Sequence, residues 1–216
     1  MNLISKKLVK VTVVIVCAMC AGGYLYAEHI HGFLSATVPV DAQILVIEGW
    51  LPDDALKKAA ERVAEKPYEW VIAVGGPLEH GFFLSEYGTS ANLARATLIK
   101  ISNRKDIVAV ASPSVRKDRT YASAVALKRW LDQNQVGSNK VNIVSFDTHA
   151  RRSWYLFKKA LGDHYSVGVI AIDASDYDGN RWWTSSQGFK RVIEETIAYG
   201  YTLLLFPFAE DLAAGD

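Results

Sequence analysis

The stretch that decides the fold reads Ser145-Phe146-Asp147-Thr148-His149-Ala150-Arg151-Arg152-Ser153. An apolar run, residues 141–144, precedes it, and residues 154–161 continue it with apolar side chains at helical spacing before Gly162. Such a pattern is typical of a strand, a sharp turn and the start of a helix. Asp147 or Thr148 is placed to cap that helix by accepting hydrogen bonds from its free backbone N–H groups.

The same turn carries basic side chains. His149 and Arg152 are three residues apart, so they share one face of the first helical turn. The free N–H groups and the helix dipole favour an anion there, and an arginine adds a forked, charged donor. The stretch therefore predicts an anion-binding strand-to-helix turn.

Outward from this turn, short apolar and β-branched segments alternate with amphipathic ones. The alternation predicts an α/β fold in which helices cover both faces of a parallel sheet. The expected strands are residues 43–48, 70–74, 107–111, 141–145 and 166–172. The expected helices are residues 53–66, 89–101, 119–133, 149–161 and 186–205, with Asp118 as the cap of the third.

The N-terminal residues predict a membrane anchor. Residues 11–27 are uncharged, residues 8–9 extend this run, and a bilayer span needs about 20 residues. Lys6, Lys7 and Lys10 precede the run, which places the N-terminus in the cytoplasm and the rest of the chain outside it. A cleaved signal peptide and a core helix are the alternatives. We expect an anchor over residues 1–27 that meets the membrane through residues 8–27, a juxtamembrane linker over 28–41, one α/β domain over 42–206 and a tail over 207–216.

Composition excludes some classes of function. The chain has 216 residues and a formal charge of +1, but without the three N-terminal lysines 21 basic residues face 23 acidic ones, about −2. A mildly acidic body argues against a nucleic-acid surface. Cys17 and Cys20, the two cysteines of the sequence, lie inside the apolar run, so the predicted domain has no disulfide or thiolate metal site. No metal is expected, because the acidic and histidine residues lack a specific ligand spacing.

In a parallel sheet the strand-to-helix turns meet at one carboxyl edge, where ligands bind. Gly75 and Gly76 allow a close approach to a ligand there, although tight-turn glycines are the alternative. Arg119 and Thr120 begin another helix, where a basic residue favours a bound anion unless it pairs with Asp118 or Asp147.

His149 is the candidate general acid or base at this edge, oriented by Asp147 or Glu48, with a structural histidine as the alternative. The sequence has no dinucleotide-binding glycine fingerprint, no Walker lysine motif and no Gly-x-Ser-x-Gly elbow.

Several motifs, taken in this order, resemble the ElyC/SanA/YdcF family, the bacterial domain of unknown function 218. They cover about residues 42–201 and are Ile44-Leu45-Val46-Ile47-Glu48-Gly49-Trp50, Val74-Gly75-Gly76, Arg119-Thr120-Tyr121-Ala122-Ser123-Ala124, His149-Ala150-Arg151-Arg152-Ser153, and Trp183-Thr184-Ser185-Ser186 with Glu195. The glycines, the threonine, the histidine and Arg152 match the family pattern, whereas Arg119 stands where many members have asparagine.

The resemblance implies a Rossmann-like α/β domain behind one transmembrane helix, in the inner membrane of a bacterium, with a role in envelope biogenesis. It implies no agreed reaction. Nucleotide-like ligands, including S-adenosylmethionine, and phosphate-bearing lipid carriers are both compatible with the crevice. We therefore expect an extracytoplasmic domain that binds a small anionic or lipid-phosphate ligand, with His149-assisted chemistry. A non-catalytic envelope interaction module and a cytosolic-facing, cofactor-dependent transferase are the alternatives, and the oligomeric state stays open.

Overall fold

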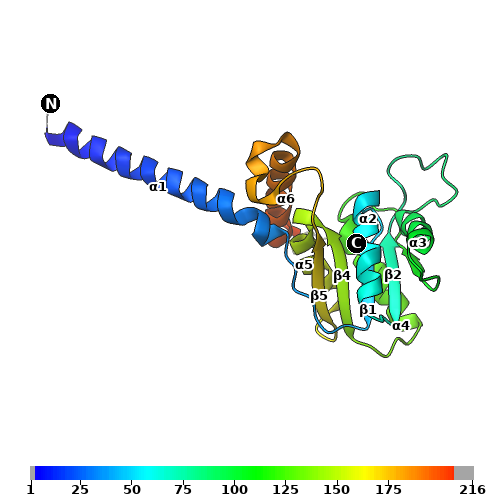
Figure 1. Ribbon diagram of the computed structural model, residues 1–216. Helices are drawn as coiled ribbons and strands as arrows, with labels where there is room; N and C mark the ends of the chain where they lie inside the picture. The colour runs from blue at the N-terminus through cyan, green and yellow to red at the C-terminus, as the bar shows by residue number, and fades with distance from the viewer. Residues whose placement is uncertain (1–2, 207–216) are drawn as a thin grey trace.

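A five-stranded, all-parallel sheet forms the centre of the domain (Figure 1). The computed structural model describes residues 3–206. The strands lie in the order β3-β2-β1-β4-β5. Their bounds are β1 Ile44–Glu48, β2 Trp70–Gly75, β3 Val108–Ala111, β4 Lys140–Phe146 and β5 Ser166–Ile172. The sheet confirms the predicted α/β class, and each predicted strand forms to within a residue or two.

Helices cover both faces of the sheet, as the fully apolar strands predict. On one face, Leu45 and Ile47 of β1 pack with α2 (Asp53–Glu65) and α3 (Ser90–Ile101). On the other face, Ile44 and Val46 pack with α4 (Arg119–Gln133) and α5 (Ala150–Leu161). Successive β1 side chains alternate between the two cores because a strand has a period of two. The fold is therefore Rossmann-like and doubly wound.

The strand order reverses between β1 and β4, which are neighbours in the sheet although β2 and β3 come between them in the chain. The connections after β1 and after β4 therefore lead to helices on opposite faces of the sheet. A crevice opens at the carboxyl ends of such a pair, and ligands of open α/β sheets bind there. Glu48 ends β1 and Phe146 ends β4, so both lie at this switch point.

The N-terminal helix α1 runs from Leu3 to Leu34 and projects from the domain (Figure 1). Residues Lys10–Leu34 are long and apolar enough to cross a membrane, which is consistent with a signal-anchor or a signal sequence. The helix continues into the segment expected to be a linker, and Leu34 is buried. Beyond it, Val38 forms an antiparallel bridge with Val169 of β5. The segment over 28–41 is therefore partly helical and partly packed on the sheet.

The last two elements pack beside the end of α1. The 3-10 segment η2 (Gly179–Thr184) leads into α6 (Ser186–Leu204), and Ser185 caps α6 by accepting from Gly188 N. Leu34, Trp182 and Val192 form a small core between these elements and α1.

Two predicted caps do not form the expected side-chain hydrogen bond, although Asp118 does occupy the N-cap position of α4. Neither Asp147 nor Thr148 caps α5, because a 3-10 turn, η1 (Asp147–His149), precedes the helix and Asp147 has φ 48°. Asp118 precedes α4 with φ 57° and makes no side-chain cap hydrogen bond. Thr89, by contrast, caps α3 by accepting from Asn92 N at 3.2 Å.

Candidate functional site

A cleft of about 990 Å³ lies at the carboxyl edge of the sheet. The helices α3, α4 and α5 all begin at its wall, where Ser90, Arg119 and Arg152 line the cleft. Of the eight residues predicted for the site, the structure brings seven together in the lining of this cleft: Glu48, Gly75, Gly76, Arg119, Thr120, His149 and Arg152.

His149 has a different partner on each ring nitrogen. Its Nδ1 lies 2.9 Å from Glu195 Oε1, and its Nε2 lies 3.4 Å from Thr120 Oγ1 and 3.9 Å from Glu48 Oε1. The ring of Trp50 meets the imidazole edge to face, with centroids 4.8 Å apart. In the tautomer in which Nδ1 donates to this carboxylate, Nε2 is free to accept a proton, which is the geometry of a general base.

Arg152 holds the carboxylate that orients His149. Its Nε donates to Glu195 Oε2 at 2.9 Å, and its Nη2 donates to Oε1 at 2.8 Å. The Nη2 atom also lies 2.8 Å from His149 Nδ1. A guanidinium nitrogen carries two N–H groups, so Nη2 can donate both to the carboxylate and to an unprotonated Nδ1, whereas a protonated Nδ1 donates to Glu195. The fork that was expected to bind a ligand anion is therefore occupied by Glu195.

The electrostatics of Glu195 follow from these bonds. Burial raises the pKa of its carboxyl, but the hydrogen bonds from Arg152 and His149 outweigh burial and hold the pKa well below its usual range. Glu195 is therefore ionised at neutral pH. The sequence singled it out only within the family resemblance, without a role, because it lies 46 residues from His149 on another helix.

Glu48 is a buried carboxylate at the base of the cleft, with 2 % of its surface exposed. Its Oε2 accepts from Ser153 Oγ at 2.9 Å, and Ser153 Oγ accepts in turn from Ser145 Oγ at 3.3 Å. The other oxygen, Oε1, faces His149 Nε2. The predicted proximity of Glu48 and His149 is thus present, on the side of the imidazole that faces the cleft.

Of the two residues predicted to orient His149, Glu48 lies beside the imidazole and Asp147 does not contact it. Its carboxylate accepts from Tyr177 OH and lies 3.1 Å from His31 Nε2, in a second pocket of about 430 Å³ at the end of α1. Burial raises the pKa of Asp147, but the hydrogen bonds from His31 and Tyr177 outweigh burial, so the pKa lies below its ordinary value. The backbone of Asp147 is left-handed, and its side chain lies in this second pocket rather than in the cleft.

The glycines lie where β2 ends against α3. A Cβ on Gly75 would lie 2.1 Å from Ser90 Oγ, and a Cβ on Gly76 would lie 3.2 Å from Ser112 Oγ. Gly75 therefore permits a close approach of β2 and α3. Its role in packing is an alternative to a role in ligand binding. Gly76 has more room and lines the cleft.

Arg119 stands at the mouth of the cleft with 67 % of its side chain exposed, and it pairs with Glu79 from the loop after β2. Arg116 and Lys117 line the same wall. These cations, together with the start of α4, are the donors best placed for an anion. Among residues 3–206, no group of three or more histidine, cysteine, aspartate or glutamate side chains could hold a metal ion.

Comparisons with known proteins do not assign this chain to a family. No family model matches the chain, and no curated protein matches it significantly.

Proposed function

We propose that this chain is a membrane-anchored protein whose α/β domain binds a phosphorylated or nucleotide-like ligand in the cleft, with His149 transferring a proton at Nε2. One observation carries the proposal: Glu195 fixes His149 at Nδ1 while Nε2 faces a cleft at which three helices begin. Oriented imidazoles of this kind act as general acids or bases. The resemblance to the ElyC/SanA/YdcF family supports a setting in the bacterial envelope.

The roles divide along the cleft. Arg119 and Thr120 at the start of α4, with Gly76 in the same lining, receive the anionic group of the ligand. Thr120 Oγ1 also lies 3.4 Å from His149 Nε2, so the group that gains or loses a proton at His149 and Glu48 is next to this anionic group. Arg152 is a positioning residue in this proposal, since it holds Glu195 rather than the ligand.

Titration calorimetry on the full chain in detergent tests the anion-binding half of the proposal. The probes are inorganic phosphate, adenosine monophosphate, S-adenosylmethionine and farnesyl phosphate. We expect at least one probe to bind, and Arg119→Ala to weaken that binding by about tenfold or more, because a charged hydrogen bond is lost. Arg129→Ala is the matched control, since Arg129 is an exposed arginine farther along α4 that does not line the cleft. Equal affinities of the two variants, or no binding of any probe, contradict the proposal.

A second candidate function, a non-catalytic envelope interaction module, is favoured by one observation. Arg152, Glu195 and His149 already satisfy one another without a ligand. Such a closed network is sufficient to fix α6 against α5 and requires no chemistry. This candidate predicts that none of the four probes binds, so the same titration separates the two functions.

A further inference from the structure

The outer side of η2 and α6 carries an apolar face that the domain does not cover. It consists of Trp183, Phe189, Ile197 and Leu204, whose exposed fractions are 39 %, 53 %, 68 % and 69 %. Phe189, Ile197 and Leu204 are eight and seven residues apart, which places them on one side of α6. Large apolar side chains gathered on one helix face mark a surface that meets an apolar partner.

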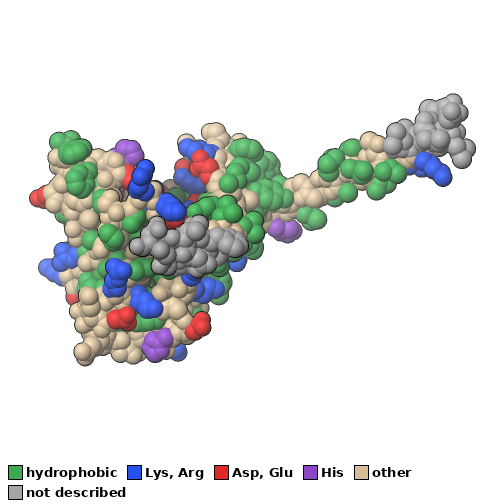
Figure 2. Space-filling view, turned by 180° about the vertical axis from the view of Figure 1, so that it is seen from behind, with side chains coloured by type: hydrophobic (Ala, Val, Ile, Leu, Met, Phe, Trp, Pro, Cys, Tyr) green, Lys and Arg blue, Asp and Glu red, His purple; other side chains and the backbone are tan. Residues whose placement is uncertain are grey.

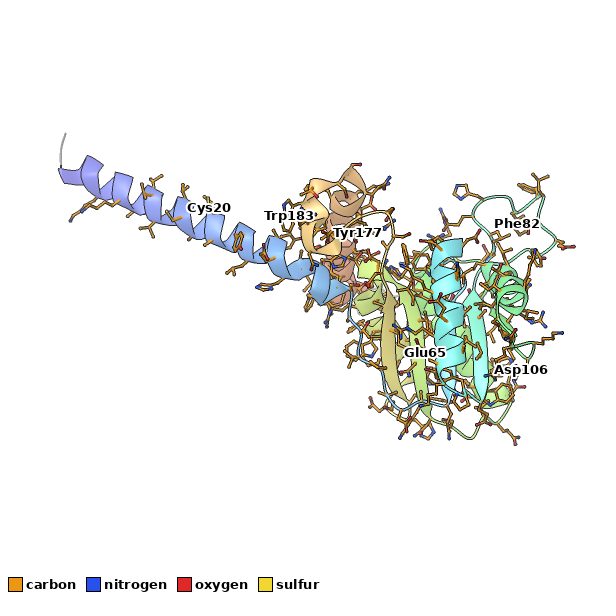
Figure 3. All side chains as sticks on the ribbon, in the orientation of Figure 1. Cys20, Glu65, Phe82, Asp106, Tyr177 and Trp183 are labelled. Atoms are coloured by element: carbon orange, nitrogen blue, oxygen red, sulfur yellow. The ribbon has the colours of Figure 1, made fainter. Side chains whose placement is uncertain are left out.

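This η2–α6 apolar face lies beside residues 26–27, where the uncharged part of the candidate membrane span ends. Trp182 Nε1 donates to the carbonyl of Ala27 at 2.8 Å, and Tyr26 OH lies 2.9 Å from Thr196 Oγ1 of α6. Figure 2 shows hydrophobic side chains gathered where α1 leaves the domain and continuing along α1. Figure 3 shows Trp183 next to α1. The face is therefore continuous with the apolar surface of the helix.

We propose that the η2–α6 apolar face lies in the interface of the bilayer that α1 crosses, so that the domain rests on the membrane rather than standing away from it. The inference depends on the proposed membrane anchor and adds an orientation to it. Tryptophan and other aromatic residues concentrate at the membrane–water interface, and the apolar side of an amphipathic helix binds there. Hydrogen bonds from α6 and η2 to residues 26–27 hold the face level with the end of the span.

Another exposed apolar segment of the domain provides a contrast. Phe83 and Leu84 are 97 % and 95 % exposed on the loop after β2. Figure 3 shows Phe82 of this loop on the side of the domain away from α1. This loop cannot reach the same bilayer when α1 is inserted, so exposure alone does not predict membrane contact. It serves as the aqueous reference in the test.

The test uses nitroxide labels on the full chain in vesicles of phosphatidylethanolamine and phosphatidylglycerol. Cys17→Ser and Cys20→Ser remove the two cysteines, and single labels are then placed through Ile197→Cys, Phe189→Cys, Val14→Cys or Leu84→Cys. All four sites are exposed, and of these side chains Phe189 also contacts the ring of Trp182. Collision with oxygen reports a lipid environment, and collision with a water-soluble nickel chelate reports water.

We expect the labels at positions 197 and 189 to favour oxygen at interfacial depth, the label at 14 to lie deep in the bilayer, and the label at 84 to favour nickel. Labels at 197 and 189 that favour nickel while the label at 14 is deep overturn the inference and leave the anchor intact. Labels at 197 and 189 shielded from both reagents indicate a protein partner or a second copy and also overturn it. A label at 14 that favours nickel removes the anchor itself, and the inference with it.

Discussion

Two carboxylates from distant parts of the chain meet one imidazole at His149. Glu48 ends β1 and faces Nε2, whereas Glu195 lies on α6 and faces Nδ1. Their environments differ, since Glu195 has a guanidinium partner and Glu48 has a serine hydroxyl. A pair of carboxylates with unlike partners around a histidine is an arrangement from which acid and base roles are built.

The pH dependence of stability follows from Glu195. Its pKa in the folded chain is below the ordinary value, so its ionisation stabilises the fold above the unfolded pKa of about 4.3, and this contribution is lost as the pH falls toward the folded pKa. We expect Glu195→Gln to lower the free energy of unfolding by about 2 kcal/mol at pH 7. The difference from the unchanged chain should shrink as the pH falls below about 5.

Denaturant unfolding in detergent from pH 3 to pH 7 measures this difference. The matched control is Glu194→Gln, because Glu194 is the exposed neighbour on α6 and its oxygen lies 3.9 Å from Lys190 Nζ. We expect the control to change stability by no more than about 0.5 kcal/mol at any pH in the range. An effect of Glu195→Gln that does not vary with pH contradicts the assignment of an ionised, paired carboxylate.

At the scale of elements, the start of α3 lies against the ends of β1 and β2. A Cβ on Gly49 would lie 2.5 Å from the carbonyl oxygen of Ser90, and a Cβ on Gly75 would lie 2.1 Å from the Ser90 hydroxyl. Backbone cannot rotate away as a hydroxyl can, so Gly49 is the more constrained of the two positions. Gly75, which the sequence associated with a ligand, thus also sets how closely the helix approaches the sheet.

Substitution of Gly49 tests this packing. We expect Gly49→Ala to destabilise the fold by about 1–3 kcal/mol, because the new methyl group forces β1 and α3 apart. Gly137→Ala is the control, since no atom outside its chain neighbours lies within 4 Å of the added Cβ. Thermal unfolding followed by circular dichroism measures both variants, and equal melting temperatures contradict the close approach.

At the scale of the whole molecule, α1 is joined to the domain by side-chain contacts as well as by the chain. His31 lies 3.1 Å from Asp147 Oδ1 and 3.2 Å from Tyr177 OH, and Arg151 donates to the carbonyl of Phe33. Asp147 begins the 3-10 turn η1, which ends at His149. The helix α1 therefore contacts, through His31, the same turn that carries His149 of the candidate site.

The orientation of this assembly follows from the lysines before the apolar run. We expect a C-terminal alkaline phosphatase fusion to be active and a C-terminal green fluorescent protein fusion to be dark, because positive flanks stay in the cytoplasm. Replacing Lys6, Lys7 and Lys10 together with glutamine should weaken this asymmetry. The opposite pattern of reporters contradicts the proposed orientation, and a mature chain lacking about 27 N-terminal residues by mass supports cleavage of a signal peptide instead.

Much of the fold was accessible from local sequence. The five strands and the helices from α2 to α6 were predicted to within a few residues. Apolar periodicity, and helix caps such as Thr89, depend on residues that are close in the sequence. The caps at Asp118 and Asp147 failed because both residues take left-handed backbone conformations that their sequence neighbours do not signal. The helix α1 extends to Leu34, beyond the expected end of the anchor at residue 27. Its last turns are stabilised by contacts with η2 and α6, which the local sequence does not signal.

The sequence by itself determined the element order, the parallel class of the sheet and the edge at which polar residues collect, since each depends on hydrophobic period and chain direction. Only the tertiary structure decided the strand order, the pairing of His149 with Glu195, and the position of Asp147 beside His31 in the second pocket. Those contacts join residues 46 and 116 positions apart. Contacts at that separation depend on how the layers pack, and no periodicity within a single segment encodes them.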